Sequence, residues 1–200
     1  LFPELDLPDV SLPHDQRIKN LENNAKALNP SPLLIEQYLT MAAAVAEGVV
    51  AQSERFLPCT PNGNDMACSA EVIADLGSRI FRRPLSDEDM ASYTAFFERH
   101  MNAISWNGAL ELTLTAMLQS PQFLYRLEFA DGNEPAQGQV ALDGYEMATR
   151  LSYLLWQSMP DDQLFTAAAN GQLETAEQVA AQARRMLQDP RAQVAIADFH

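Results

Sequence analysis

The residues with the clearest chemistry in this sequence are its two cysteines, Cys59 and Cys68. They bracket the segment CTPNGNDMAC, which is rich in residues that form turns. Closing so short a loop with a disulfide would stabilise the fold by roughly 2.5–3 kcal/mol in the chain-entropy model. Because such bridges persist only in oxidising compartments, we predict a Cys59–Cys68 disulfide and an exported protein, either periplasmic or at the cell surface. The alternative is a pair of reduced thiols in a cytosolic protein.

The same loop carries oxygen ligands that could hold a calcium ion. Asn62, Asn64 and Asp65 supply the hard oxygens that Ca²⁺ prefers, and a disulfide could pre-shape the loop around them. Their spacing matches no EF-hand loop, however. Turn chemistry alone also explains Asn and Asp beside Gly63, so a calcium site and an ordinary turn both stay open.

The three histidines predict no metal site, and the sequence predicts no cofactor in this chain. His14, His100 and His200 stand far apart, and none forms the helical i, i+4 pair of a zinc site. Axial ligation of a haem carried by another module is a second interpretation of these side chains. The sequence lacks C-x-x-C-H, so we expect no covalently attached haem here.

Arg82 and Arg83 precede three acidic residues at 87–89. Guanidinium groups form bidentate pairs with carboxylates, which predicts a buried or interfacial ion network. The other interpretation is a site for an anionic ligand, for which the same acidic residues would compete.

No pattern predicts catalytic residues. Asp161 and Asp162 are adjacent, and neighbours on a helix point about 100° apart, so they cannot face each other across a substrate. Their simpler role is to complement the helix dipole after Pro160. The sequence also lacks G-x-S-x-G and any glycine-rich phosphate loop.

Three aromatic residues, Tyr153, Trp156 and Phe165, lie close in sequence on either side of Pro160. Core packing is one interpretation, and a grip on a sugar or a partner module is the other. Trp156 lies outside the centre of the apolar face of its helix. We therefore take Trp156 as the first candidate for a contact with a partner.

That helix is the most strongly specified element of the chain. Asp143 and Glu146 form the pattern of a capping box, and Leu142 can pack on Met147 as a hydrophobic staple. The apolar positions that follow recur at helical spacing up to Pro160, and they predict a face made of Met147, Leu151, Leu154 and Leu155.

Nearly every other periodic segment also has the helical period, which predicts an all-α fold: an irregular bundle of about eight to nine helices with one local disulfide loop. Residues 1–30 are expected to be mostly irregular, with at most a short helix near 16–21. The predicted helices span about 31–53, 69–82, 86–101, 110–118, 121–128, 142–159, 160–170, 175–187 and 190 onwards. The expected helix starts include Ser31 followed by Pro32, Ser69, and a second capping box at Thr175 and Gln178. The apolar positions expected in the second and fourth of these helices are Val72, Ile73, Leu76 and Ile80, and Leu110, Leu114, Met117 and Leu118.

Composition restricts the partners. The formal charge of −14 repels phosphate backbones and anionic lipids, so neither nucleic acid nor a membrane surface is expected to bind. No uninterrupted apolar run reaches the roughly 20 residues of a membrane span; the nearest, 41–51, contains Glu47. The sequence starts without Met and stops inside a periodic pattern, so we expect a piece of a longer polypeptide.

The order of four segments carries a resemblance. NLENNAKALNPSPLLIEQYL, IFRRPLSDEDM, LTAMLQSPQFLYRLE and LDGYEMATRLSYLLWQSMPDDQL together resemble the planctomycete-specific domain families of unknown function. The domains of these families look like consecutive helical modules of large exported bacterial proteins, and those proteins often carry c-type cytochrome segments. The resemblance implies the later part of one module at 1–55, a second module at 56–130 with the disulfide loop at its start, and the beginning of a third at 140–200. It also implies export and the Cys59–Cys68 bridge.

The resulting expectation is a non-catalytic helical scaffold or interaction module of a larger exported protein. Its expected partners are other modules of the same polypeptide, and a haem could be carried elsewhere in that polypeptide. The alternative is part of an exported oxidoreductase or polysaccharide-processing enzyme whose active site is completed by other segments. The sequence sets no oligomeric state.

Overall fold

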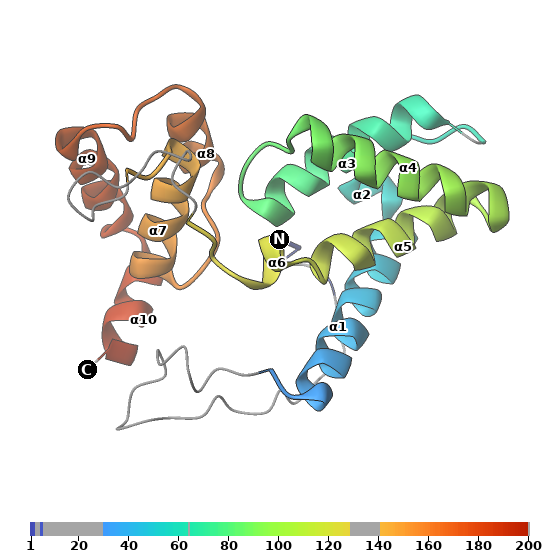
Figure 1. Cartoon of the computed structure of the whole chain (residues 1–200). Coiled ribbons are helices and arrows are strands. Elements are labelled where there is room, and N and C mark those ends of the chain that lie inside the picture. Colours follow the sequence, from blue (N-terminus) through green and yellow to red (C-terminus); the bar gives the residue numbers. More distant parts are fainter. Residues whose placement is uncertain (3–4, 6–29, 64, 129–140, 200) are drawn as a thin grey trace. The chain divides into compact units, whose positions relative to one another are not determined.

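The computed structural model describes residues 1–2, 5, 30–63, 65–128 and 141–199. These residues form ten helices and no strand, which confirms the all-α prediction (Figure 1). The short helix expected near 16–21 lies outside them. The helices are α1 (Pro32–Ala51), α2 (Ser53–Phe56), α3 (Met66–Phe81), α4 (Asp87–Ala103), α5 (Trp106–Leu118), α6 (Pro121–Leu124), α7 (Gly144–Trp156), α8 (Asp162–Ala169), α9 (Ala176–Met186) and α10 (Pro190–Phe199).

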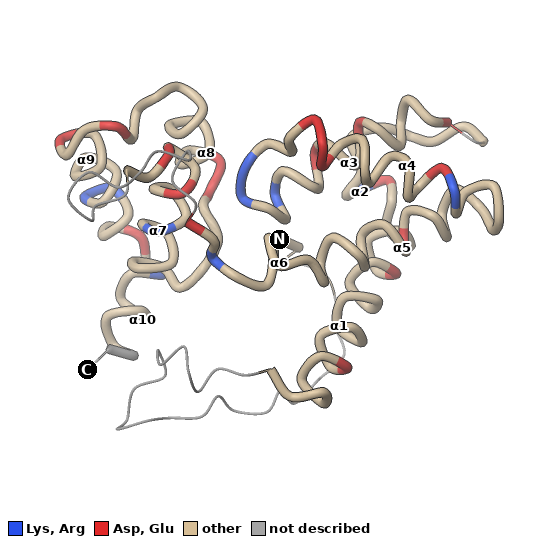
Figure 2. The backbone as a smooth tube through the Cα atoms, viewed as in Figure 1, with Lys and Arg blue, Asp and Glu red and all other residues tan. Residues whose placement is uncertain are grey.

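The chain divides into two compact units. The α1 unit comprises residues 2–77 and 86–120, with α1, α2, α4, α5 and most of α3. The α7 unit comprises residues 1, 78–85 and 121–200, with the end of α3 and α6 to α10. Their charges differ (Figure 2). The described part of the α1 unit carries only two basic residues, Arg55 and Arg99, among many acidic ones, whereas most of the described arginines belong to the α7 unit.

In the α1 unit, α5 packs against both α1 and α4. Ser31 caps α1 by accepting a hydrogen bond from the N–H of Leu34, with Pro32 at the first helical position, as the sequence predicted. The apolar positions predicted for α3 and α5 are all buried in this unit, namely Val72, Ile73 and Leu76 in α3, and Leu110, Leu114, Met117 and Leu118 in α5. Ile80, in the last turn of α3, is also buried but belongs to the α7 unit. Helical periodicity therefore located this core correctly.

The predicted cap of α3 is wrong. Ser69 lies inside the helix, fully buried, and its hydroxyl donates to the carbonyl of Met66. Asp65 precedes the helix instead, and its Oδ1 accepts the N–H of Cys68 at 3.0 Å, which is the hydrogen bond of an N-cap. Ser and Asp both cap helices well, so the sequence alone did not separate the two starts.

α1 is long and apolar enough to cross a membrane, judged by length and composition alone. Its mean hydropathy reaches 1.4 over 18 residues. It packs against α5 along one face, where Ala42, Ala46 and Val49 are buried, although only 17% of the 18-residue window is buried. A signal sequence shares these properties, so the expectation that the chain lacks a membrane span stays a prediction.

In the α7 unit, α7 packs against α8, α9 and α10. The capping box of Asp143 and Glu146 forms as predicted, and so does the one of Thr175 and Gln178 that begins α9. Gly144 allows a close approach to α8, because a Cβ atom there would lie 3.0 Å from the carbonyl oxygen of Ala168.

The predicted apolar face of α7 is partly wrong. Leu151 is buried, and Met147 and Leu155 pack against the core, but Leu154 is 71% exposed. Small residues take the fully buried places instead, since Ala148 and Ser152 face inwards together with Trp156. The face is therefore rotated relative to the prediction, because Ala and Ser carry little weight in an apolar pattern.

Candidate functional site

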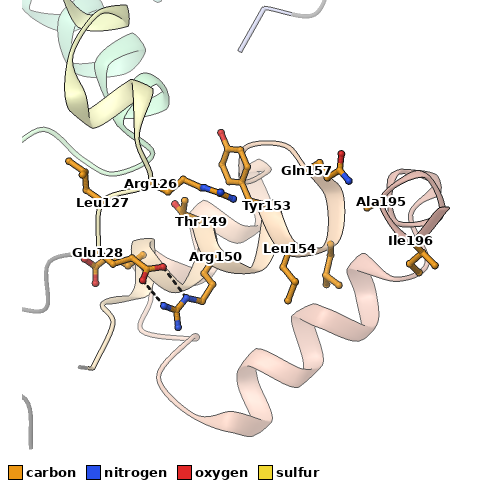
Figure 3. A pocket seen from close by; sticks show the side chains of 12 residues that line it. Arg126, Leu127, Glu128, Thr149, Arg150, Tyr153, Leu154, Gln157, Ala195 and Ile196 are labelled. Carbon is orange, nitrogen blue, oxygen red and sulfur yellow. Dashed lines mark hydrogen bonds and ion pairs between the residues drawn. The ribbon is translucent and has the colours of Figure 1, made fainter. Parts of the chain in front are cut away.

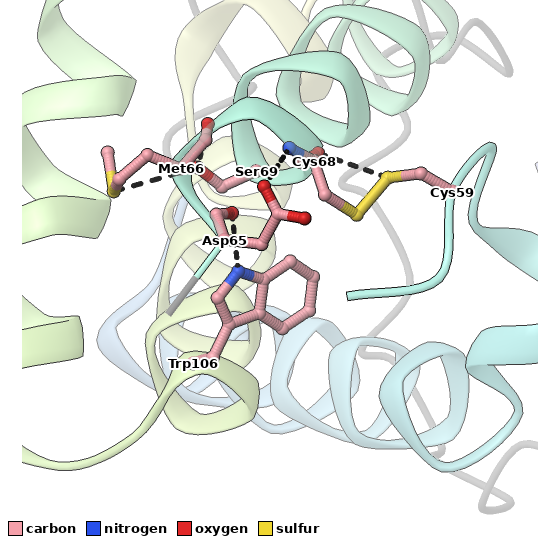
Figure 4. Close-up of a disulfide and its surroundings, with 6 residues drawn as sticks. All are labelled: Cys59, Asp65, Met66, Cys68, Ser69 and Trp106. Carbon is pink, nitrogen blue, oxygen red and sulfur yellow. Dashed lines mark hydrogen bonds between the residues drawn. A yellow bond between two sulfur atoms is a disulfide. The ribbon is translucent and has the colours of Figure 1, made fainter. Parts of the chain in front are cut away.

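The two cysteines form the predicted disulfide, Cys59–Cys68, with their Cα atoms 5.8 Å apart (Figure 4). The bond joins the segment before α3 to the first turn of that helix. Cys68 is buried, whereas Cys59 is partly exposed. The bridge therefore fixes the start of α3 within the α1 unit.

Asp65 connects this loop to the core. Its carbonyl oxygen accepts a hydrogen bond from Nε1 of Trp106 at 3.0 Å (Figure 4). Trp106 in turn packs edge-to-face on Phe97. Because the Asp65 carboxylate already caps α3, its observed role is structural.

The calcium hypothesis for this loop stays a prediction. Asn62 is exposed, and Asn64 lies outside the described residues. The described part of the chain holds no group of three or more His, Cys, Asp or Glu side chains that could bind a metal ion. His14 and His200 also lie outside it, and Nδ1 of His100 lies 2.8 Å from the carbonyl oxygen of Phe96.

Arg82 is 5% exposed and follows α3 in the left-handed conformation, with φ of 58°. Its guanidinium donates to three main-chain carbonyls at the end of α6: Gln122 at 2.6 Å, Phe123 at 3.2 Å and Tyr125 at 2.8 Å. Burial lowers the pKa of Arg82 from its ordinary value. The carbonyl dipoles at the end of this helix stabilise the buried cation in place of a carboxylate.

Arg83 also binds the main chain. Its guanidinium donates to the carbonyl of Pro84 at 2.9 Å and lies over the ring of Phe81. Asp89, one of the acidic residues expected to pair with these arginines, forms a capping box with Ser86. Anion binding by Arg82 and Arg83 stays a prediction.

The α7 unit contains an open groove of about 1030 Å³, which we name the α7 groove (Figure 3). Aliphatic side chains from α7 and α10 form one part, and polar side chains from α7 and residues 126–128 form the other. Its lining comprises Arg126, Leu127, Glu128, Glu146, Thr149, Arg150, Tyr153, Leu154, Leu155, Gln157, Ala195 and Ile196.

Tyr153, in the polar part of the groove, has two arginines near its ring, of which only Arg126 lines the groove. The Arg126 guanidinium lies 5.0 Å from the ring centre of Tyr153, and that of Arg82 lies 5.9 Å from it (Figure 3 shows Arg126 extending towards Tyr153). Arg150 forms a bidentate ion pair with Glu128, with Nε to Oε1 at 2.9 Å. This hydrogen bonding raises the pKa of Arg150. The pair is largely exposed and therefore contributes little stability.

Trp156 is 5% exposed and belongs to the core of the α7 unit. Its Nε1 donates to the carbonyl of Met186 at 3.0 Å. The guanidinium of Arg191 lies 3.6 Å from a ring centre of Trp156, and that of Arg185 lies 5.5 Å away. This geometry favours core packing over the partner contact that the sequence suggested for Trp156.

Asp161 begins α8. Its Oδ1 accepts the N–H of Leu164 at 2.9 Å, and its carboxylate forms an ion pair with Arg185, with Oδ2 to Nη1 at 2.7 Å. Burial opposes ionisation of Asp161, but the hydrogen bonds from Arg185 and Leu164 outweigh it and lower the pKa of the carboxyl. Asp161 therefore holds a helix end, as expected for an aspartate at this position.

The structure does not bring the three aromatic residues together as a set. Phe165 packs on Tyr145 with ring centres 6.4 Å apart, Tyr153 lines the α7 groove, and Trp156 lies in the core. No sequence pattern marks Arg126 or Ile196 as a residue of a site. The exposure of Leu154 results from the rotation of the apolar face of α7, which the sequence pattern did not predict.

Comparisons with known proteins assign the chain to families. Three family models match consecutive segments: PSD3, a protein of unknown function (DUF1587), at residues 4–51; PSD5, a protein of unknown function (DUF1595), at residues 68–128; and PSD4, a protein of unknown function (DUF1592), at residues 142–200. No curated protein and no solved structure matches the chain. The resemblance to these families is thereby confirmed: residues 4–51, 68–128 and 142–200 belong in turn to the planctomycete-associated PSD3, PSD5 and PSD4 families of unknown function.

Proposed function

We propose that this chain is a non-catalytic helical scaffold and interaction module of a larger exported protein. The observation that carries the proposal is that charged side chains of the described residues bind groups of their own chain. Arg82 binds the carbonyls that end α6, Asp65 begins α3, and Asp161 begins α8 while pairing with Arg185. Catalytic groups need donors and acceptors that are directed at a substrate, whereas these groups are directed at the backbone of their own chain.

The exposed apolar residues support the interaction role. Leu154 and Ile196 are 71% and 51% exposed, and they line the same groove. Aliphatic side chains gathered in one concave surface are typical of a place where another protein segment packs. The order of PSD3, PSD5 and PSD4 segments fits partners that are further modules of the same polypeptide.

A turnover assay tests the non-catalytic part of the proposal. The purified chain would be incubated with chromogenic esters, phosphate esters and glycosides, and with a redox dye plus reductant. We expect the rate to equal that of the same chain after heat denaturation. Saturable turnover that disappears in the Glu146→Gln or Tyr153→Phe variant would contradict the proposal and favour the enzyme alternative.

Export is supported by the disulfide, because such bonds persist in oxidising compartments. Alkylation of freshly isolated protein without reductant should label neither Cys59 nor Cys68, as read by mass spectrometry. Two labelled thiols would remove the argument for export.

We also propose that any haem of the parent protein is bound outside this chain, because the chain has no C-x-x-C-H. The purified chain should show no absorption band near 400 nm after expression in a host that matures c-type cytochromes. A Soret band that persists through purification would overturn this statement.

A further inference from the structure

The α7 groove presents aliphatic side chains to solvent. Leu154 lies on α7 and Ile196 on α10, and both are more than half exposed. A single exposed leucine is ordinary, as Leu187 shows with 49% exposure outside the groove. Leu154 and Ile196 differ from Leu187 because they line one concavity together with Leu155 and Ala195 (Figure 3). A ligand that fills the groove would remove them from water.

The polar part of the same groove contains one guanidinium without a carboxylate partner. Among the described residues, Arg126 pairs with no carboxylate, and its guanidinium lies 5.0 Å from the ring centre of Tyr153. The two acidic residues of the lining are already engaged, since Glu128 pairs with Arg150 and Glu146 accepts the N–H of Asp143. A carboxylate placed beside Arg126 would therefore meet a guanidinium without a carboxylate partner in a chain of net charge −14.

The shape of the groove indicates the size of the ligand. Small-molecule sites enclose most of their ligand in about 300–1,000 Å³. This groove has about 1030 Å³ and remains open, with the side chain of Leu154 largely in solvent. An open apolar groove between helices suits an amphipathic helix, whose apolar residues three and four positions apart enter the groove.

We propose that the α7 groove binds an amphipathic helical segment of another protein module, with aliphatic residues against Leu154 and Ile196 and an Asp or Glu side chain paired with Arg126. The proposal rests on the interaction role proposed above and names the site and chemistry of that interaction. Arg126 supplies a planar fork that matches a carboxylate, and its guanidinium makes a cation–π contact with the ring of Tyr153 at 5.0 Å.

The test uses a random 12-residue peptide library displayed on phage, which is selected on the intact chain with its disulfide oxidised. We expect enriched peptides to combine aliphatic residues spaced three or four apart with an Asp or Glu. The best peptide, fluorescein-labelled, would then be titrated by fluorescence polarisation. Leu154→Glu and Arg126→Glu should each weaken its binding at least tenfold.

Two matched controls keep the test specific. Leu187→Glu and Arg184→Glu change an exposed leucine and an exposed arginine of the same unit outside the groove, and they should change the affinity less than twofold. Selection on the Arg126→Glu variant should yield peptides with Lys or Arg in place of the acidic residue. Circular dichroism of every variant confirms that it is folded before binding is measured.

The possible results distinguish the proposal for the α7 groove from the proposal that the chain is a non-catalytic interaction module. Failure to enrich any peptide, or enrichment of peptides without an acidic residue, would overturn the site and its chemistry. Peptides that bind Leu154→Glu and Arg126→Glu as tightly as the original chain would also overturn it, yet they would leave the interaction role intact at another surface. Failure of the wider proposal would appear as catalytic turnover in the assay described above.

Discussion

Replacement of Arg82 by Ala should destabilise the chain strongly, because the buried guanidinium of Arg82 binds the main chain. The change removes the donor for the carbonyls of Gln122, Phe123 and Tyr125. Hydrogen bonds from a charged group contribute about 1.5–3 kcal/mol each, but removal of a buried cation also recovers its desolvation cost. We therefore expect a net loss of about 2–3 kcal/mol, measured by urea unfolding followed by circular dichroism.

A second variant separates hydrogen bonding from backbone strain at this position. Arg82 has φ of 58°, a conformation that costs a residue with a Cβ about 1 kcal/mol relative to glycine. Arg82→Gly loses the same hydrogen bonds but relieves this strain, so it should be about 1 kcal/mol more stable than Arg82→Ala. Arg99→Ala, at an exposed position of α4, serves as the control and should stay within about 0.5 kcal/mol of the original. An Arg82→Ala variant as stable as this control would refute the reasoning.

Three further predictions follow from the same structure. Reduction of the disulfide should lower the free energy of unfolding by about 2–3 kcal/mol, as measured by urea titration with and without reductant. Trp156→Phe should cost about 0.5–1.5 kcal/mol in the same assay, because it removes the hydrogen bond from Nε1 to the carbonyl of Met186, which keeps the N–H of Asp189 as its other donor. Asp161→Asn keeps a capping side chain but loses the ion pair with Arg185, so it should melt at a lower temperature than the original at pH 7. Folding lowers the pKa of the Asp161 carboxyl below 3.8, so the stability from this group is present above that pH and is lost as the pH falls through the lower folded pKa. The difference in melting temperature between Asp161→Asn and the original should therefore shrink below about pH 4. A difference that stays constant with pH would contradict a stabilising role of the Asp161 carboxylate.

Local signals in the sequence predicted local structure well. The capping box of Asp143 and Glu146 formed as expected, as did the helix start at Ser31 and the disulfide. These features depend on residues within a few positions of one another, or on a short loop. The sequence alone is sufficient for them, because propensity and hydrogen bonding act there over short distances.

Features that depend on distant partners were not predictable in the same way. Arg82 binds main-chain carbonyls about 40 positions away, and every residue type offers such a carbonyl, so no sequence signal marks it. Trp156 was placed outside the apolar face because its partner, the carbonyl of Met186, is equally invisible in the sequence. The rotation of α7 that exposes Leu154 followed from buried small residues, which apolar periodicity underweights.

The central claim, that this chain is an interaction module, is tested most directly by its binding to the further modules proposed for the same polypeptide. The remaining modules would be produced separately and titrated onto the immobilised, oxidised chain by biolayer interferometry. We predict saturable binding with a Kd of about 10 μM or tighter, which corresponds to roughly 7 kcal/mol. The absence of binding at about tenfold higher concentration, with both partners folded, would contradict the claim.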